Sequence, residues 1–152
     1  NVYVKLQDVV AEASNQNWSN YFNNKLKDRI GMTGAWLQTG NFSVYWSTTR
    51  SMARFGLLFL HDGVWNNERL ISSEWIQNAI EPSVANVNYG FMWWLNKKGA
   101  RHWEGVGEEV YYAAGFGGNF IIIDRKHDLV VVTRWLEPNK VGEFMAKLTK
   151  AL

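Results

Sequence analysis

The sequence has 152 residues, of which 47% are hydrophobic and 20% charged, as in a soluble globular chain that can bury a core. Its net charge of +2, with both signs interspersed, argues against a nucleic-acid binder, which would concentrate Lys and Arg on one stripe. The absence of cysteine excludes a disulfide scaffold, a thiolate zinc site and a cysteine nucleophile.

The first elements expected along the chain are two helices and a long loop. Apolar residues at helical spacing predict a helix over residues 3–14. A second helix is expected after Asn17, a favourable N-cap, and it ends at Gly31, where a C-cap glycine is favoured. Residues 32–46 mix Gly, Thr, Asn and aromatic residues without a clean period. We interpret them as a long surface loop, a kind of segment that often carries function.

Two further helices are expected before the middle of the chain. Ser47-Thr48-Thr49 caps a third helix, which His61-Asp62-Gly63 ends. Residues 64–70, with their Asn66-Asn67 pair, predict a tight turn or short hairpin. Ser72 is the expected N-cap of a fourth helix over residues 74–80, and Pro82 closes it.

The second half of the sequence changes to strand-like patterns. Residues 88–96 are rich in aromatic residues and predict a strand, and residues 97–109 predict a loop. Three successive strands are expected at residues 110–114, 119–124 and 129–135, with a hairpin turn at residues 125–128. A final helix follows Pro138. Helices, then an antiparallel sheet, then a closing helix predict an α+β fold.

The most unusual segment runs over residues 111–119, Tyr-Tyr-Ala-Ala-Gly-Phe-Gly-Gly-Asn. Three glycines stand where one strand ends and the next begins. Glycine weakens a strand, so it indicates that another backbone or a ligand comes close. The alternative is a bulge or corner of the sheet. The spacing is not that of a phosphate-binding loop, and a strand rather than a helix follows.

Four stretches of the sequence, taken in order, are similar to one family of enzymes. They are residues 8–32 with Trp-Ser-Asn-Tyr-Phe and Ile-Gly-Met, residues 46–56 with Ala-Arg-Phe-Gly, residues 89–95 with Tyr-Gly-Phe-Met-Trp-Trp-Leu, and Ala-Gly-Phe-Gly-Gly-Asn at residues 114–119. The chain resembles the class C β-lactamase-like serine hydrolases and penicillin-binding proteins, in the branch of esterases, D-aminopeptidases and nylon-oligomer amide hydrolases. The resemblance implies the C-terminal portion of a β-lactamase/transpeptidase-like fold.

That resemblance implies a domain organisation and a mechanism. Residues 1–152 would form one partial domain, with late helices of the helical subdomain and a loop at residues 1–83 and sheet strands with the C-terminal helix at residues 84–152. Enzymes of this kind hydrolyse small ester, amide or peptide substrates through an acyl-serine, without a metal or organic cofactor. The family's third motif falls on residues 113–115, which would place the backbone N–H of Phe116 in the oxyanion hole.

The expected site residues follow from the same resemblance and from exposed aromatic residues that could line a substrate cleft. Gly115 and Phe116 are assigned to the catalytic strand, and seven residues are assigned to substrate contacts: Ala113, Ala114, Gly117, Gly118, Asn119, Trp46 and Trp93. Trp93 and its neighbour Trp94 would face opposite sides of a strand, so that one is core and the other could line the cleft. Gly117→Val is expected to block substrate while leaving the fold mostly intact.

The sequence departs from the family's pattern in three places. None of its serines is followed by lysine three residues later, the Tyr-x-Asn motif is missing, and Ala113 replaces a lysine or histidine. We therefore expect the nucleophile, base and tyrosine on an N-terminal part outside these residues, and the chain alone to be inactive. The alternatives are a non-catalytic module that binds peptidoglycan or peptide, and a structural fragment that is stable only beside its missing half.

Other function classes find little support in the sequence. No apolar run approaches the ~20 residues that span a bilayer, so no membrane span is expected. His61, His102 and His127 are dispersed without metal-ligand spacing and are interpreted as surface or turn residues. The chain opens directly in a periodic segment without a signal peptide, as a fragment would. The lack of cysteine suits a periplasmic or secreted bacterial protein and is equally compatible with the cytoplasm.

Overall fold

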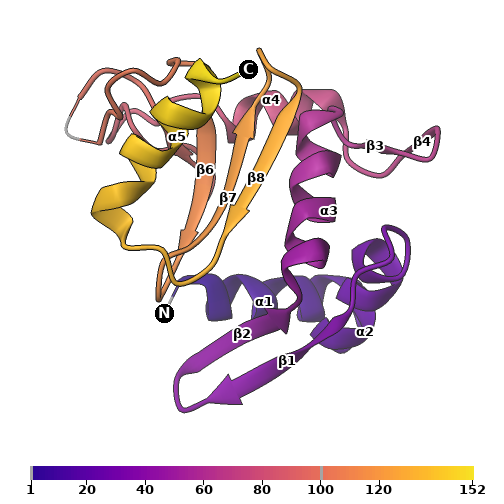
Figure 1. The fold of residues 1–152 in the computed structure, drawn as a ribbon. Coiled ribbons are helices and arrows are strands. Elements are labelled where there is room, and N and C mark those ends of the chain that lie inside the picture. Colours follow the sequence, from indigo (N-terminus) through magenta and orange to yellow (C-terminus); the bar gives the residue numbers. More distant parts are fainter. Residues whose placement is uncertain (1, 100) are drawn as a thin grey trace. The chain divides into compact units, whose positions relative to one another are not determined.

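The computed structural model describes residues 2–99 and 101–152. The chain divides into two compact units, Asn1–Arg54 and Phe55–Leu152. Figure 1 shows the order of their helices and strands. Helices precede a four-stranded antiparallel sheet and a C-terminal helix closes the chain, which confirms the predicted α+β class.

The first unit begins with two helices that the sequence predicted. α1 spans Val2–Ser14 and α2 spans Trp18–Phe22, which continues into a π-helical turn, η1, at Asn23–Lys27. The side chain of Asn17 accepts a hydrogen bond from the backbone N–H of Ser19, so the expected N-cap is confirmed. Gly31 follows with φ at +67°, a left-handed conformation that suits glycine after a helix.

The predicted loop over residues 32–46 is wrong, because these residues form a β-hairpin. β1 (Gly34–Thr39) pairs antiparallel with β2 (Phe42–Ser47). Their two-residue turn is Gly40-Asn41, a pair typical of tight hairpins. On one face, Trp36 and Tyr45 stand opposite each other with ring centroids 5.3 Å apart and pack against rings of α2.

Helix α3 (Thr49–Leu60) begins in the first unit and continues into the second. A short hairpin, β3 (Val64–Trp65) with β4 (Glu68–Arg69), follows it, and α4 spans Ser73–Ala79. The two asparagines of the hairpin turn have φ of +48° and +64°, the conformation that tight strand turns require. The Ser72 hydroxyl accepts the N–H of Trp75. The hairpin and this N-cap were both predicted.

The sheet of the second unit has the strand order β5-β6-β7-β8, with every neighbouring pair antiparallel. Its strands are β5 (Trp94–Leu95), β6 (Tyr111–Gly115), β7 (Asn119–Asp124) and β8 (Leu129–Thr133). The last three were predicted within two residues at each end. The strand expected over residues 88–96 is reduced to two residues, because the chain turns at Phe91 and Met92 and the N–H of Gly90 donates to the carbonyl of Trp93 at 2.9 Å.

Alternating side chains give the sheet two buried faces. One face packs with residues of α3 and α4, including Phe59 and Ile76, around Tyr111 and Ile123. A Cβ added at Gly56 of α3 would lie 2.6 Å from the Val130 side chain, so this helix approaches the sheet closely. The other face packs against α5 (Val141–Lys150), which lies beside β6 in Figure 1. The predicted closing helix begins with a 3₁₀ turn, η2, at Pro138–Lys140.

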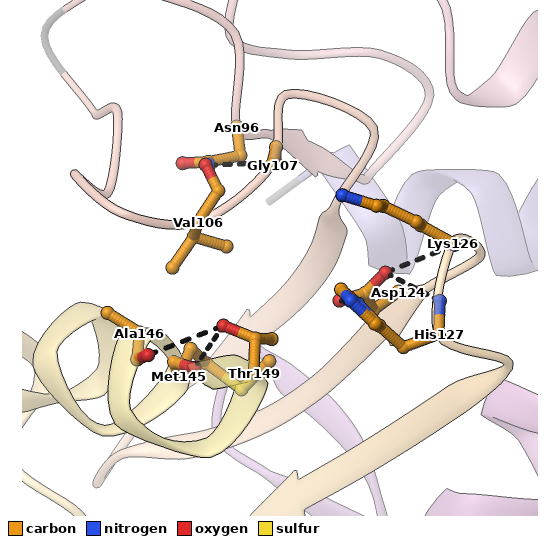
Figure 2. A network of polar contacts seen from close by, with 9 residues as sticks. All are labelled: Asn96, Val106, Gly107, Asp124, Lys126, His127, Met145, Ala146 and Thr149. Atoms are coloured by element: carbon orange, nitrogen blue, oxygen red, sulfur yellow. Dashed lines mark hydrogen bonds and ion pairs between the residues drawn. The ribbon is translucent and has the colours of Figure 1, made fainter. Parts of the chain in front are cut away.

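The loop between β5 and β6 is held by one buried asparagine. The side-chain amide of Asn96 donates to the carbonyls of Val106 and Gly107, each at 3.0 Å, and its oxygen accepts the N–H of Trp103 at 2.6 Å. Figure 2 shows the amide reaching the main chain of the loop. The side chain of Asn96 therefore fixes the backbone of residues 103–107, which form no helix or strand and precede β6.

Candidate active site

The edge of β6 is paired for only part of its length. β7 pairs with all five residues of β6, whereas β5 pairs only with Tyr111 and Tyr112. Beyond these two residues the side of β6 that faces away from β7 has no strand beside it in the described ranges, 2–99 and 101–152. Ala114 and Gly115 are exposed, and Phe116 is 95% exposed. The end of β6 is thus an open main-chain edge.

The register fixes the direction of the main-chain groups at this edge. The carbonyl of Val110 accepts the N–H of Asn96 at 2.9 Å, so Val110 faces β5, and alternation turns Ala114 to the same side. Gly115 then faces β7, where it stands opposite Asn119. Across the trans peptide the N–H of Phe116 points away from the carbonyl of Gly115, toward the open edge. Outside the β ladders, no hydrogen bond found among the described residues uses this N–H.

Two of the three glycines are required by the hairpin between β6 and β7. Gly117 and Gly118 have φ of +73° and +69°. A Cβ on Gly117 would collide with the indole of Trp135, and one on Gly118 with the carbonyl oxygen of Leu136. The expectation that Gly117→Val leaves the fold intact is therefore wrong, because the chain's own conformation and packing demand glycine there.

Gly115 differs from the other two glycines. Its φ is not positive, and a Cβ added to it would meet only Asn119, with the nearest atom at an ordinary contact distance of 3.5 Å. Neither backbone strain nor packing within the described chain calls for a glycine at this position. Its missing side chain leaves the surface of the edge open to an approaching molecule.

Asn119 and Arg134 hold the hairpin turn beside this edge. The side-chain amide of Asn119 donates to the carbonyl of Phe116, and its oxygen accepts the Nε–H of Arg134 at 3.1 Å. Asn119 therefore bonds the turn rather than pointing freely into solvent. No pattern in the sequence indicated Arg134, because its contact depends on the pairing of β7 with β8.

The two aromatic residues expected to line a cleft lie in different surroundings. Trp93 is 4% exposed and packs among Phe55, Phe59 and Tyr111, with ring centroids 4.6 Å apart for the Phe59 pair. It is core and offers no surface to a ligand, so its assignment to substrate is corrected. Trp46 lies on β2 in the first unit and is 63% exposed. Its assignment stays a prediction.

The polar cluster at the other end of the sheet is structural. Asp124 is buried at the end of β7 and accepts hydrogen bonds from the N–H groups of Lys126 and His127 and from the His127 imidazole, the last at 2.7 Å (Figure 2). It closes the β7–β8 turn, where His127 was expected. No group of three or more His, Asp or Glu suited to a metal ion occurs within the described part of the chain.

Burial changes the pKa of Tyr111, the first residue of β6. Burial raises the pKa of the Tyr111 phenol above its ordinary value of 10.0, and the nearby Arg125 guanidinium opposes this only in part. The Tyr111 hydroxyl donates to the carbonyl of Phe59 at 3.4 Å, and Arg125 donates to the same carbonyl at 3.2 Å. The neutral phenol thus anchors β6 to the C-terminal part of α3.

Alkaline unfolding is expected to report on this phenol. The unfolded chain loses the phenol proton near pH 10, while the folded chain keeps it to higher pH, so the folded state binds more protons there. The contribution is fully present below pH ~10 and is lost as the pH rises through the raised value. Urea unfolding between pH 9 and 12 should show a shallower loss of stability for Tyr111→Phe than for the unchanged chain. Equal slopes of unfolding free energy against pH for the two proteins would contradict a raised pKa at Tyr111.

Comparison with known proteins gives the fold a name. No protein-family model matches the sequence, and no curated protein matches it either. Two solved structures superpose over 96% of the chain: a candidate 6-aminohexanoate-dimer hydrolase from Bacillus anthracis, with a TM-score of 0.73 and 18% identity, and a β-lactamase from Mycobacterium bovis, with 0.72 and 19%. The chain has the β-lactamase-like fold. A candidate β-lactamase from Bacteroides dorei also matches 92% of it, with a TM-score of 0.64 and 16% identity.

The match to the β-lactamase-like fold covers only part of each neighbour. The chain spans 40%, 59% and 53% of the three neighbouring chains, in the order named above. At identities below one fifth, the likeness extends to the fold and not to the activity. No helix in the described ranges is both long and apolar enough to cross a membrane.

Proposed function

We propose that the open edge of β6 is one wall of the active site of a serine hydrolase that cleaves ester or amide bonds. The observation that carries the proposal is the N–H of Phe116, aimed at an exposed, unpaired edge beside a glycine that the chain does not need for its own packing. Such an N–H can stabilise the negative charge that develops on a substrate carbonyl oxygen.

The remaining parts of the reaction fall to residues outside this chain. A serine hydroxyl, provided by another part of the protein, adds to the substrate carbonyl carbon while a base takes its proton. The carbonyl oxygen becomes an oxyanion between the N–H of Phe116 and a second N–H, that of the serine itself. The bond to the alcohol or amine leaving group then breaks with return of a proton, and water hydrolyses the acyl-serine.

The main chain of β6 would also position the substrate. The N–H and carbonyl of Ala114 face the open side, so an extended substrate can pair with them as an added strand. Ala113 offers no charged group, and its methyl packs against the core cluster on the α3 face. Recognition of a substrate carboxylate by the third motif, as a lysine there would provide, is therefore not part of the proposal. The candidate 6-aminohexanoate-dimer hydrolase among the structural neighbours supports this choice of bond.

The experiment that tests the proposal uses a fluorophosphonate probe, which labels activated serines covalently. We expect no labelling of the isolated 152-residue chain, because none of its serines is followed by lysine at the third position. The longer protein that contains this chain is expected to be labelled once and to hydrolyse p-nitrophenyl esters. Labelling of the isolated chain would contradict the assignment of the nucleophile to another segment.

A second outcome would favour a different function. If the longer protein contains Ser-x-x-Lys and still resists the probe, the open edge is better explained as a binding surface for an extended peptide or peptidoglycan stem. The same unpaired main-chain groups would then hold the ligand without chemistry. Calorimetry with a short peptide then distinguishes the two explanations. A binding module binds the peptide, whereas an unfolded or blocked enzyme does not.

A further inference from the structure

We propose that a surface pocket near the start of β6 binds a small zwitterion, such as an amino acid, through its carboxylate and its ammonium group. The inference does not depend on the proposed hydrolase. The pocket has a volume of about 450 Å³ and lies between the loop before β6, the β7–β8 turn and α5, all in the second unit. Pockets of this size hold small molecules. Titratable side chains of both signs line it: Glu109, Lys126, His127 and Lys150.

Buried polar side chains hold two of the three walls of the pocket. Asn96 is fully buried and fixes residues 103–107, two of which line the pocket. Asp124 is 1% exposed and accepts the main-chain N–H groups of Lys126 and His127, which fixes the turn. Figure 2 shows both sets of hydrogen bonds. The pocket is therefore preformed, which reduces the entropy lost when a ligand binds.

Two glycines of the loop allow its chain to lie close to the neighbouring groups of the pocket. Gly105 has φ at +75°, and a Cβ added to it would lie 3.3 Å from the Ala146 side chain on α5. A Cβ added to Gly107 would collide with the carboxylate of Glu109. The Glu109 carboxylate therefore lies over the main chain at Gly107, beside the pocket.

The charged groups of the pocket are not paired with one another. Within residues 2–99 and 101–152, no ion pair uses the ammonium of Lys126, the ammonium of Lys150 or the carboxylate of Glu109. Figure 2 shows the Lys126 side chain extending from the turn toward the loop that carries Gly107. Two cations and one anion thus face the same pocket and are available to a ligand.

His127 adds a directed polar group to the basic side of the pocket. Its Nδ1 atom lies 2.7 Å from the Oδ2 atom of Asp124, and its side chain is 28% exposed. Because Nδ1 faces the buried carboxylate, the Nε2 atom points away from it, and no hydrogen bond found in the described part of the chain uses Nε2. A protonated imidazole held in this way donates from Nε2 to a ligand carboxylate.

The balance of charges favours a ligand that carries both signs. A simple anion would be attracted by Lys126 and Lys150 but repelled by Glu109, and a simple cation would meet two ammonium groups. A zwitterion directs its carboxylate to the lysines and its own ammonium to Glu109, so that every charge in the pocket gains a partner. Hydrogen bonds between ionised groups are the strong ones, and this ligand makes them at both ends.

The test measures binding of three small molecules to the longer protein that contains this chain. They are L-alanine, propionate, which lacks the ammonium group, and ethylamine, which lacks the carboxylate. NMR titration follows the main-chain amide signals of Gly105 and Gly107, which line the pocket. We expect the Kd of L-alanine to be about tenfold lower than that of either single-charge molecule, because only L-alanine makes ionised contacts at both ends.

Two substitutions in the pocket separate the contributions of its charges. Glu109→Gln is expected to abolish the preference for L-alanine over propionate, because it removes the partner of the ammonium group. Lys126→Met is expected to weaken L-alanine and propionate about tenfold each and to leave ethylamine binding no weaker.

Two neighbouring substitutions are matched controls. Glu108→Gln removes a carboxylate that pairs with Lys98 at 3.7 Å, and Lys147→Met removes an ammonium group on α5 that pairs with Glu143 at 2.8 Å. Neither of these described side chains lines the pocket. Both variants are expected to keep the Kd of L-alanine within about twofold of the unchanged protein, since charges outside the pocket are screened by solvent. Thermal unfolding verifies that each variant is folded.

Three outcomes would overturn the proposal. The first is equal affinity of the unchanged protein for L-alanine and propionate. The second is full L-alanine binding by both Glu109→Gln and Lys126→Met, and the third is no shift of the Gly105 and Gly107 signals with any of the three molecules. None of these outcomes bears on the proposed hydrolase, because the pocket and the open edge of β6 share no residue.

Discussion

Replacement of Gly115 by valine is expected to lower ester turnover by the longer protein about 100-fold or more while the protein stays folded. A Cβ at this position finds ordinary contact distances, and β-branched residues suit strands, so the fold tolerates the change. The two γ-methyl groups would occupy the space through which a substrate carbonyl approaches the N–H of Phe116. Steady-state kinetics and circular dichroism measure the two effects separately, and Gly115→Ala should give an intermediate loss.

Gly118→Val is the matched control for this substitution. Its side chain would collide with the carbonyl of Leu136 in a left-handed backbone conformation, so we expect destabilisation of about 3 kcal/mol or more. Full activity of Gly115→Val would show that the substrate does not approach along the edge of β6. Unfolding of Gly115→Val to the same extent as Gly118→Val would show that all three glycines serve the hairpin alone.

Asn96→Ala is expected to give the largest loss of stability among single polar substitutions away from the proposed site. It removes three close hydrogen bonds and leaves the buried carbonyl of Val106 and the partly buried main-chain groups of Gly107 and Trp103 without their partner. Unpaired buried groups cost about 1–3 kcal/mol each and rearrange in part, so a loss of about 3 kcal/mol in unfolding free energy is expected. Urea unfolding of the chain and its variant measures the difference.

The control for Asn96 is an asparagine on the surface. Asn78 is exposed on α4, where alanine is the better helix former, so Asn78→Ala should change stability little or raise it slightly. A loss below 1 kcal/mol in Asn96→Ala would mean that the loop between β5 and β6 does not depend on this side chain. In that case the start of β6 would need another explanation for its position.

Local chemistry predicted most of the elements in this chain. The N-caps at Asn17 and Ser72, the Asn66-Asn67 turn and the valine-rich strands all depend on near neighbours in sequence, and the structure has each of them. The hairpin of β1 and β2 was missed although the Gly40-Asn41 pair indicated it. The segment was expected to be a surface loop, because its apolar and polar residues do not alternate with a period of two.

The site was only partly predictable, because its key features arise from pairing between distant segments. From the sequence, the three glycines were expected to serve the same purpose. Only the positions of Trp135 and Leu136 distinguish Gly117 and Gly118, which the hairpin requires, from Gly115. The early end of β5 depends on the turn at Met92, which propensity would not place there. Propensities describe neither long-range contacts nor unfavourable backbone conformations that the rest of the fold sustains.

The most direct test is a crystal structure of the longer protein with a phosphonate bound covalently to its nucleophilic serine. The phosphonyl oxygen stands for the oxyanion of the tetrahedral intermediate. We expect this oxygen 2.7–3.1 Å from the main-chain nitrogen of Phe116, with the rest of the inhibitor lying along the open edge of β6. A bound phosphonate whose oxygen contacts other donors, with the β6 edge covered by protein, would contradict the account.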